Sequence, residues 1–151
     1  IPDIVLFGKK TQVSGLMAIE NLNGSFDREH VNRLEVTWNS DTIDMIRCKH
    51  IIKSFKKNNI LENVNKRGKQ ITGLLSKIGG IEGLRSQGLI IGFDMESCKT
   101  RDKFMKVLRN KGMICNSTGV KSIRLRPNLF INEEDANYGC QLIKEALEEI
   151  Q

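Results

Sequence analysis

The sequence lacks several features that mark particular classes of protein. No apolar run approaches the roughly 20 residues that a membrane-spanning helix needs, and no basic segment followed by an apolar one marks an export signal. The four cysteines are widely separated and form no C-x-x-C or Cys/His spacing, so neither a metal site nor a disulfide framework is expected. We therefore expect a soluble, cytoplasmic protein with reduced thiols and no bound metal.

Aromatic residues are scarce, with one Trp and one Tyr, and this bears on the meaning of the net charge of +6. Between residues 60 and 78 the apolar residues form one helical stripe, and Lys66, Lys69 and Lys77 point the other way. That pattern is typical of a solvated helix face. With few rings to stack on bases and no recognition motif, the sequence disfavours nucleic acid as a partner, and the lack of apolar runs disfavours a membrane.

The length and composition suit an ordinary folded domain. At 151 residues, with 39% hydrophobic and 28% charged residues, the chain can bury one core. Periodicity and turn residues predict strands over residues 3–7, 14–19, 89–95, 113–115 and 122–126. Helices are predicted to start at Ser40 or Asp41, at Ile60, at the cap Thr100 and at the cap Asn132. The expected fold class is mixed α/β, with a polar loop over residues 21–32 and Gly112 just past the third helix.

Two adjacent lysines, Lys9 and Lys10, follow the first predicted strand in the stretch FGKKTQVSG. Their spacing leaves two interpretations open. They are either basic residues at a strand end facing water, or they include an amine that condenses with a carbonyl cofactor. A lysine pair is a weak motif by itself, so the rest of the chain has to decide.

The stretch PDIVLFGKKTQVSGLMA resembles the cofactor-lysine segment of the class III (ω-amino acid) aminotransferases, which are pyridoxal-phosphate enzymes of fold type I. VTWNSDTIDMIR at 36–47 and KSIRLRPNLF at 121–130 follow in the order of that family. The similarity is greatest to L-lysine 6-aminotransferases and next to 4-aminobutyrate aminotransferases. The resemblance implies the C-terminal part of such an enzyme. Residues 1–80 would be the end of the large cofactor-binding domain with its connecting helices, and residues 81–151 the small α+β domain.

The resemblance also selects one lysine. In the family the cofactor lysine is followed by small residues four and five positions later, and counting from Lys10 gives Ser14 and Gly15. It implies that Lys10 holds pyridoxal 5'-phosphate covalently and moves the proton between the substrate carbon and the cofactor. Lys9 would then face away, because adjacent strand residues point to opposite sides.

Without the resemblance, Thr37 is interpreted as a β-branched residue next to the start of a helix. The resemblance implies instead that it binds the cofactor phosphate of the neighbouring subunit, which makes a homodimer part of the active site. The family usually has glycines just after the Trp, whereas this chain has Asn39 and Ser40. Asn tolerates positive φ better than most residues, so we expect the turn to survive.

Arg124 and Arg126 alternate with Ile123 and Leu125, so a strand turns both guanidiniums to one face. By itself this predicts a basic outer face. The resemblance to the IRFRP segment of the family implies that Arg124 clamps the substrate carboxylate, a task that suits its planar fork, and that Arg126 is structural. His30 and His50 have no ligand spacing around them and are interpreted as structural or surface residues.

The function implied by the resemblance is transfer of a terminal amino group, first of all the ε-amine of L-lysine, to 2-oxoglutarate. Donors left open are 4-aminobutyrate and ornithine, and the alternative of another class is a non-catalytic domain that keeps the fold. In the family, the acid that pairs with the pyridine nitrogen, the aromatic that stacks on the ring and the main phosphate-binding loop all precede the cofactor lysine. We therefore expect these 151 residues alone to be at best feebly active.

Overall fold

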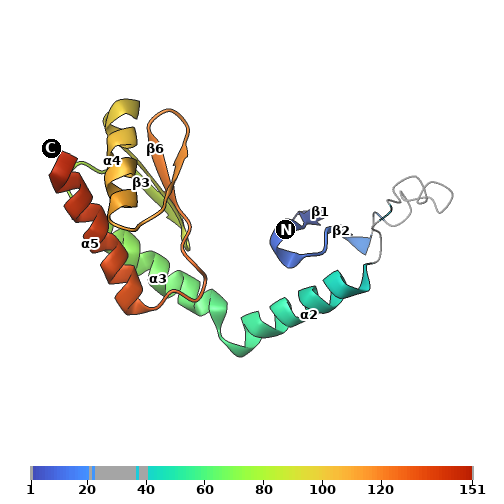
Figure 1. Ribbon diagram of the computed structural model, residues 1–151. Helices are drawn as coiled ribbons and strands as arrows, with labels where there is room; N and C mark the ends of the chain where they lie inside the picture. The colour runs from blue at the N-terminus through green and yellow to red at the C-terminus, as the bar shows by residue number, and fades with distance from the viewer. Residues whose placement is uncertain (1, 21, 23–36, 38–40, 151) are drawn as a thin grey trace. The chain divides into compact units, whose positions relative to one another are not determined.

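The computed structural model describes residues 2–20, 22, 37 and 41–150, and the chain divides into two compact units, Ile1–Asn58 and Asn59–Gln151 (Figure 1). Strands and helices both occur, as predicted for an α/β chain. The sequence analysis placed a domain boundary after residue 80. In the structure, the helix that begins after Asn59 packs against elements of the second unit. The assignment of residues 1–80 and 81–151 to a large and a small domain stays a prediction.

The first unit contains a hairpin and one long helix. Strands β1 (Ile4–Phe7) and β2 (Gly15–Ala18) lie within the two predicted strand ranges. They pair antiparallel, and the 3-10 helix η1 (Lys9–Thr11) lies between them. Helix α2 (Thr42–Lys57) starts at the predicted cap Asp41, whose Oδ1 accepts hydrogen bonds from the backbone N–H groups of Ile43 at 2.8 Å and Asp44 at 3.2 Å. No side chain of α2 is buried. Of the polar loop predicted over residues 21–32, only Leu22 lies within the described residues.

The second unit is an antiparallel four-stranded sheet in the order β3-β4-β6-β5 with three helices. The strands are β3 (Glu82–Gln87), β4 (Ile90–Asp94), β5 (Asn116–Thr118) and β6 (Ser122–Leu125). The helices are α3 (Ile60–Leu75), α4 (Cys98–Asn110) and α5 (Glu133–Ile150), and they lie on one side of the sheet (Figure 1). In the described part of the chain, no helix combines the length and the apolarity needed to cross a membrane.

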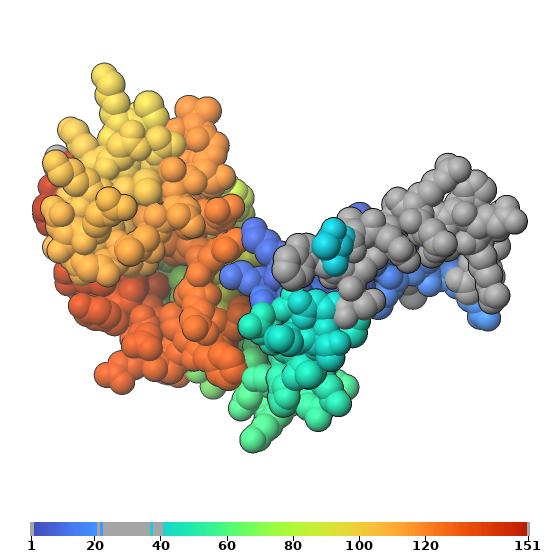
Figure 2. All heavy atoms as spheres, turned by 45° about the vertical axis from the view of Figure 1, so that its right-hand side comes forward, coloured from blue at the N-terminus to red at the C-terminus, as the bar shows by residue number. Residues whose placement is uncertain are grey.

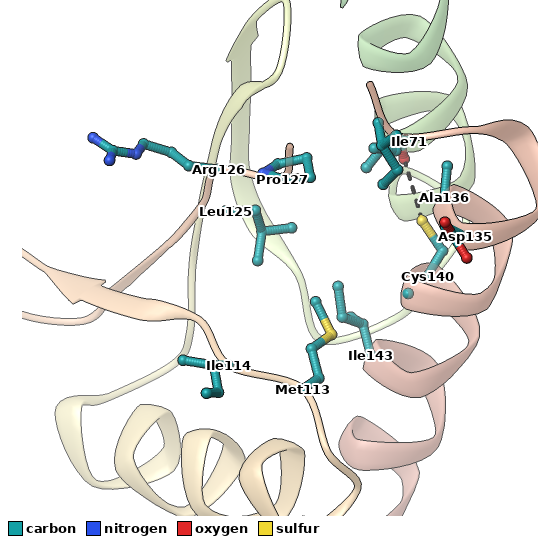
Figure 3. Close-up of a pocket in the computed structure, with 12 residues that line it drawn as sticks. Ile71, Met113, Ile114, Leu125, Arg126, Pro127, Asp135, Ala136, Cys140 and Ile143 are labelled. Carbon is teal, nitrogen blue, oxygen red and sulfur yellow. Dashed lines mark hydrogen bonds between the residues drawn. The ribbon is translucent and has the colours of Figure 1, made fainter. Parts of the chain in front are cut away.

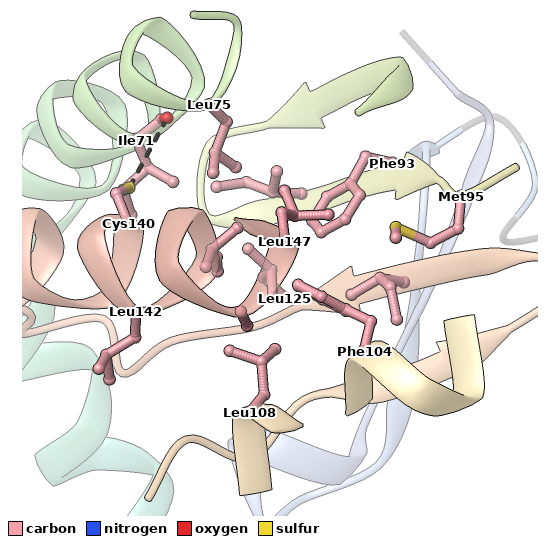
Figure 4. Close-up of a cluster of buried hydrophobic side chains, with 14 of the residues drawn as sticks. Ile71, Leu75, Phe93, Met95, Phe104, Leu108, Leu125, Cys140, Leu142 and Leu147 are labelled. Atoms are coloured by element: carbon pink, nitrogen blue, oxygen red, sulfur yellow. Dashed lines mark hydrogen bonds between the residues drawn. The ribbon is translucent and has the colours of Figure 1, made fainter. Parts of the chain in front are cut away.

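The core lies between the sheet and these helices. Along β4 and β6 every second residue is buried, so Ile91 and Phe93 face the helices together with Ile123 and Leu125. Figure 4 shows Phe93 and Leu125 among side chains of α3, α4 and α5. At the centre the rings of Phe93 and Phe104 pack edge to face with their centroids 6.2 Å apart. The opposite face of the sheet carries Asp94, Ser122 and Arg124, together with the exposed Ile90.

Helix α4 has a different start from the predicted one. Ser97, in an extended conformation, is its N-cap, and its Oγ accepts the backbone N–H of Thr100 at 3.1 Å. The predicted cap Thr100 therefore lies in the first turn. The end of α4 is as predicted, because Gly112 has a φ of 85° and its N–H donates to the Arg109 carbonyl at 3.0 Å.

The end of α4 also explains why a strand predicted over 113–115 is wrong. The N–H of Met113 donates to the carbonyl of Leu108 at 2.9 Å and completes the helix cap. The N–H of Met113 is therefore not available for pairing in the sheet. The strand begins three residues later as β5, where Asn116 pairs with Arg124. Arg101 of α4 then holds the β5–β6 turn, since its Nη1 donates to the Val120 carbonyl at 2.6 Å. In the space-filling view, α4 in yellow and this hairpin in orange lie side by side (Figure 2).

Helix α3 crosses the β3–β4 turn at very short range. A Cβ added at Gly68 would lie 2.3 Å from the carbonyl oxygen of Gly88 and 2.7 Å from its carbon. These are backbone atoms that cannot rotate away. Gly88 itself has a φ of 55°, which the turn requires. Only a residue without a side chain fits at position 68.

This contact gives a prediction for stability with a matched control in the same helix. We expect Gly68→Ala to lower the free energy of unfolding by about 3 kcal/mol, because the new methyl group forces backbone segments apart. Gly73→Ala should raise it by roughly 0.5–1 kcal/mol, since a Cβ there meets nothing within 4 Å and alanine favours a helix. Thermal or denaturant unfolding of the two variants measures both. Shifts of the same sign would contradict the close approach.

Candidate functional site

The lysine pair lies on a turn of the first unit rather than on a strand. Lys9 and Lys10 are both exposed residues of η1, and the turn is closed by the N–H of Gln12, which donates to the Lys9 carbonyl at 3.2 Å. This corrects the expectation that strand alternation turns Lys9 away from Lys10. Lys9 instead has a φ of 64°, in the left-handed region, whereas Lys10 has none of this strain. The two lysines therefore differ by backbone conformation.

Small residues on both sides of the turn let its two strands meet. A Cβ at Gly8 would lie 2.6 Å from Ser14 Oγ, and a Cβ at Gly15 would lie 2.7 Å from the Phe7 ring. Gly15 pairs with Phe7 across the hairpin, so the ring covers the glycine. Ser14 and Gly15, the small residues that follow the lysine pair, are therefore needed for the two strands to approach each other, and so they determine the position of the lysine turn.

The amine of Lys10 fits a covalent anchor for a carbonyl cofactor. The side chains of Lys9 and Lys10 form no ion pair or hydrogen bond with another residue in the described ranges. An exposed amine can be reached by an aldehyde, with which it can condense.

In the described parts of the chain, no group of three or more His, Cys, Asp or Glu residues could hold a metal ion.

The other cofactor residue proposed from the sequence, Thr37, is an exposed turn residue. Its neighbours Trp38, Asn39 and Ser40 lie outside the described residues, as does His30, so the phosphate contact of Thr37 stays a prediction. His50 is exposed on α2.

Arg124 lies on the face of the sheet opposite the core. The β6 pattern confirms the predicted alternation, since Ile123 and Leu125 are buried toward the helices and Arg124 is half-buried on the open face. Its cross-strand partners are Gly92 on β4 and Asn116 on β5. The Nε atom of Arg124 is buried and has no hydrogen-bond partner among the described residues. A guanidinium in this state is suited to receive an anionic ligand.

Three residues that the sequence analysis did not single out support this face. Ser122 Oγ donates to Asp94 Oδ1 at 2.5 Å, and Arg85 Nη2 donates to the same oxygen at 3.1 Å. The hydrogen bond from Ser122, followed by that from Arg85, lowers the pKa of the Asp94 carboxyl. Together these side chains tie β3, β4 and β6 on the face that carries Arg124. Lys10 and Thr37 lie in the first unit and Arg124 in the second.

Comparison with known proteins identifies the class. Residues 1–147 match the family model described as aminotransferase class-III, so the chain belongs to the class III aminotransferases. Enzymes of this family use pyridoxal phosphate. The match includes the lysine turn, Thr37 and Arg124.

Named relatives cover nearly the whole chain. The L-lysine-epsilon aminotransferase of Mycobacterium tuberculosis is 28% identical over 153 residues, which are 97% of this chain and 34% of the relative. The 4-aminobutyrate aminotransferase of Schizosaccharomyces pombe is 29% identical over 153 residues, which are 97% of this chain and 31% of the relative. A solved lysine aminotransferase from M. tuberculosis superposes with a TM-score of 0.89 and 26% identity, covering 100% of this chain and 36% of that one. The chain spans about a third of the length of these relatives.

Proposed function

We propose that the protein transfers a terminal amino group from a small amine donor to 2-oxoglutarate with pyridoxal 5'-phosphate, and that this chain supplies the covalent anchor and the carboxylate clamp. The observation that carries the proposal is the family match over residues 1–147, a range that contains an exposed lysine turn and an arginine on the open face of the sheet.

Each residue has a distinct task in the proposed reaction. Lys10 Nζ would hold the cofactor covalently, and once free its amine would take the proton from the substrate carbon that bears the amine and deliver it to the cofactor. Arg124 binds the substrate carboxylate through its two terminal nitrogens and so orients that carbon. Thr37 holds the cofactor phosphate across a homodimer interface. When bound, pyridoxal phosphate supplies the electron sink that makes this carbon acidic.

L-Lysine is the donor that we favour, with its ε-amine as the group transferred. The support is that L-lysine-epsilon aminotransferases of mycobacteria and of Streptomyces clavuligerus are among the relatives, at 27–28% identity. The second candidate is 4-aminobutyrate, because relatives with that name reach 29–30% identity. Ornithine is a third donor of the same chemical class.

A donor panel tests the proposal. The complete protein, supplied with pyridoxal phosphate and 2-oxoglutarate, is assayed for glutamate formation with L-lysine, 4-aminobutyrate and L-ornithine. We expect the highest kcat/KM for L-lysine. A preference for 4-aminobutyrate would replace the donor and keep the reaction, whereas no transfer from any amine would favour a non-catalytic domain that retains the fold.

Three further expectations belong to this proposal. The protein acts as a homodimer in the cytoplasm, and the 151 residues assayed alone turn over feebly at best, since the chain spans about a third of its relatives. The isolated chain assayed in parallel with the complete protein measures the last point. Robust turnover by the isolated chain would contradict it.

A further inference from the structure

Two arginines lie in one row on the open face of the sheet, and a glycine separates them. Arg85 on β3 pairs with Gly92 on β4, and Gly92 pairs with Arg124 on β6. Figure 3 shows Leu125 on the side of the sheet that faces α5, so the preceding residue, Arg124, lies on the other side. A Cβ added at Gly92 would lie 3.5 Å from Arg85 Nε. Because this glycine has no side chain, the two arginines line the same hollow.

Hydrogen bonds hold the guanidinium of Arg85 at its end of the row. Its Nη1 donates to the Gly83 carbonyl at 2.7 Å, and its Nη2 donates to Asp94 Oδ1 at 3.1 Å and to Ser122 Oγ at 3.2 Å. Of these three acceptors only Asp94 is charged. Its carboxylate is therefore the counter-ion that matches the charge of Arg85.

Arg124 is in a different state. Its Nε atom is buried and has no hydrogen-bond partner among the described residues. A buried donor without a partner is costly, so a carboxylate that approaches the row gains most at Arg124. At Arg85 the same carboxylate would have to compete with Asp94. The row thus contains one guanidinium with an unsatisfied donor and one whose charge is already matched.

We propose that Asp94 is a positioning residue, which directs the substrate carboxylate to Arg124 by neutralising Arg85. This role depends on the carboxylate-binding function proposed above for Arg124. Without the charge of Asp94, Arg85 would keep only neutral acceptors and would become a second receptor for the same carboxylate. The two arginines lie two strands apart, roughly 9–10 Å, so a ligand held by Arg85 would place its reacting carbon elsewhere. Asp94 would thus create specificity by disabling the wrong partner.

Calorimetric titration of the complete protein with glutarate tests this role without turnover, because glutarate has two carboxylates and no carbonyl group that could accept an amine. Asp94→Asn keeps the shape of the side chain and removes its charge. We expect this variant to bind glutarate at least about three-fold more tightly than the original protein, since a second guanidinium becomes available. Adding Arg85→Ala to Asp94→Asn should return the affinity to within about two-fold of the original.

Glu82→Gln is the matched control for the loss of a negative charge. Glu82 pairs with Asp94 in the register of β3 and β4, but its Oε2 accepts from Lys121 Nζ at 3.1 Å and not from an arginine. We expect Glu82→Gln to leave the affinity for glutarate within about two-fold of the original. An equal gain in this variant would mean that any lost carboxylate has the same effect, and it would overturn the role of Asp94.

Transamination kinetics give a readout that a merely structural role would not produce. A substrate bound at the wrong guanidinium is held but does not react. At saturating donor, kcat and KM for 2-oxoglutarate should therefore fall together by at least about three-fold in Asp94→Asn, with kcat/KM changed by less than about two-fold. A lowered kcat/KM that Arg85→Ala does not restore would make Asp94 a structural residue of β4.

Two other results of the glutarate titrations would contradict this role. They are an affinity that Asp94→Asn leaves unchanged or weakens, and a gain that Arg85→Ala does not reverse. If Asp94→Asn does not fold, Arg85→Ala alone decides. It should change the affinity by less than about two-fold, and a larger loss would show that Arg85 already binds the ligand. The titrations need no catalysis, so they can fail while the donor panel succeeds, and the reverse.

Discussion

Lys10→Ala in the complete protein is expected to lower kcat for transamination by at least about 10³-fold, because the variant would lose both the proposed covalent anchor and the group proposed to move the proton. Lys9→Gly is the matched control. Lys9 has a φ of 64°, which glycine adopts at no cost, so this change should preserve the turn and leave kcat within about ten-fold. Steady-state assays of the two variants with 2-oxoglutarate measure the difference.

The site of cofactor attachment can be read by mass spectrometry of peptides after borohydride reduction. We expect the label on Lys10 in the original protein and in Lys9→Gly, and no label in Lys10→Ala. A label on Lys9 with Lys10 unmodified would show that the neighbouring residue is the anchor.

Arg124→Ala is expected to raise KM for 2-oxoglutarate and to lower kcat/KM by roughly 30- to 1,000-fold, because charge-assisted, bidentate hydrogen bonds of about 2–4 kcal/mol are lost. Arg124→Lys should recover only part of this loss, since an ammonium group lacks the planar fork. The control is Arg126→Ala, which alters an exposed residue beyond the end of β6 and should change kcat/KM by less than about three-fold.

A donor without a carboxylate separates clamping from a general loss of structure. The original protein should prefer an amino acid donor over the corresponding plain alkyl amine, and Arg124→Ala should lose most of this preference. Equal losses for both donors, together with a lowered melting temperature, would instead make Arg124 a structural residue of β6.

Local signals in the sequence were sufficient for much of the second unit. Asn132 caps α5, with its Oδ1 accepting the N–H of Asp135 at 2.7 Å, and Gly112 ends α4 in the left-handed conformation that glycine favours. The alternation around Arg124 placed this residue on the open face of the sheet. Each of these features depends on residues within a few positions of one another, which is why a pattern in the sequence can reveal it.

Other features depend on geometry that a pattern does not contain. Ser97 and Thr100 are both good caps, and only the backbone decides that Ser97 is used. Lys9 takes a positive φ without being glycine, so nothing in its identity predicted a 3-10 turn in place of a strand end. The hydrogen bonds among Arg85, Asp94 and Ser122 require the pairing of β3, β4 and β6 to be known. Long-range register is thus the part that the sequence leaves open.

The contact between Gly68 and Gly88 also determines how the second unit can deform. Because the backbone of α3 at Gly68 touches the backbone of Gly88, α3 can neither rotate about its axis nor shift along the β3–β4 turn. A shift of β6 when Arg124 takes up a ligand would pass through β4 to this contact and move α3 with it. The sheet and α3 would then move together as one rigid body.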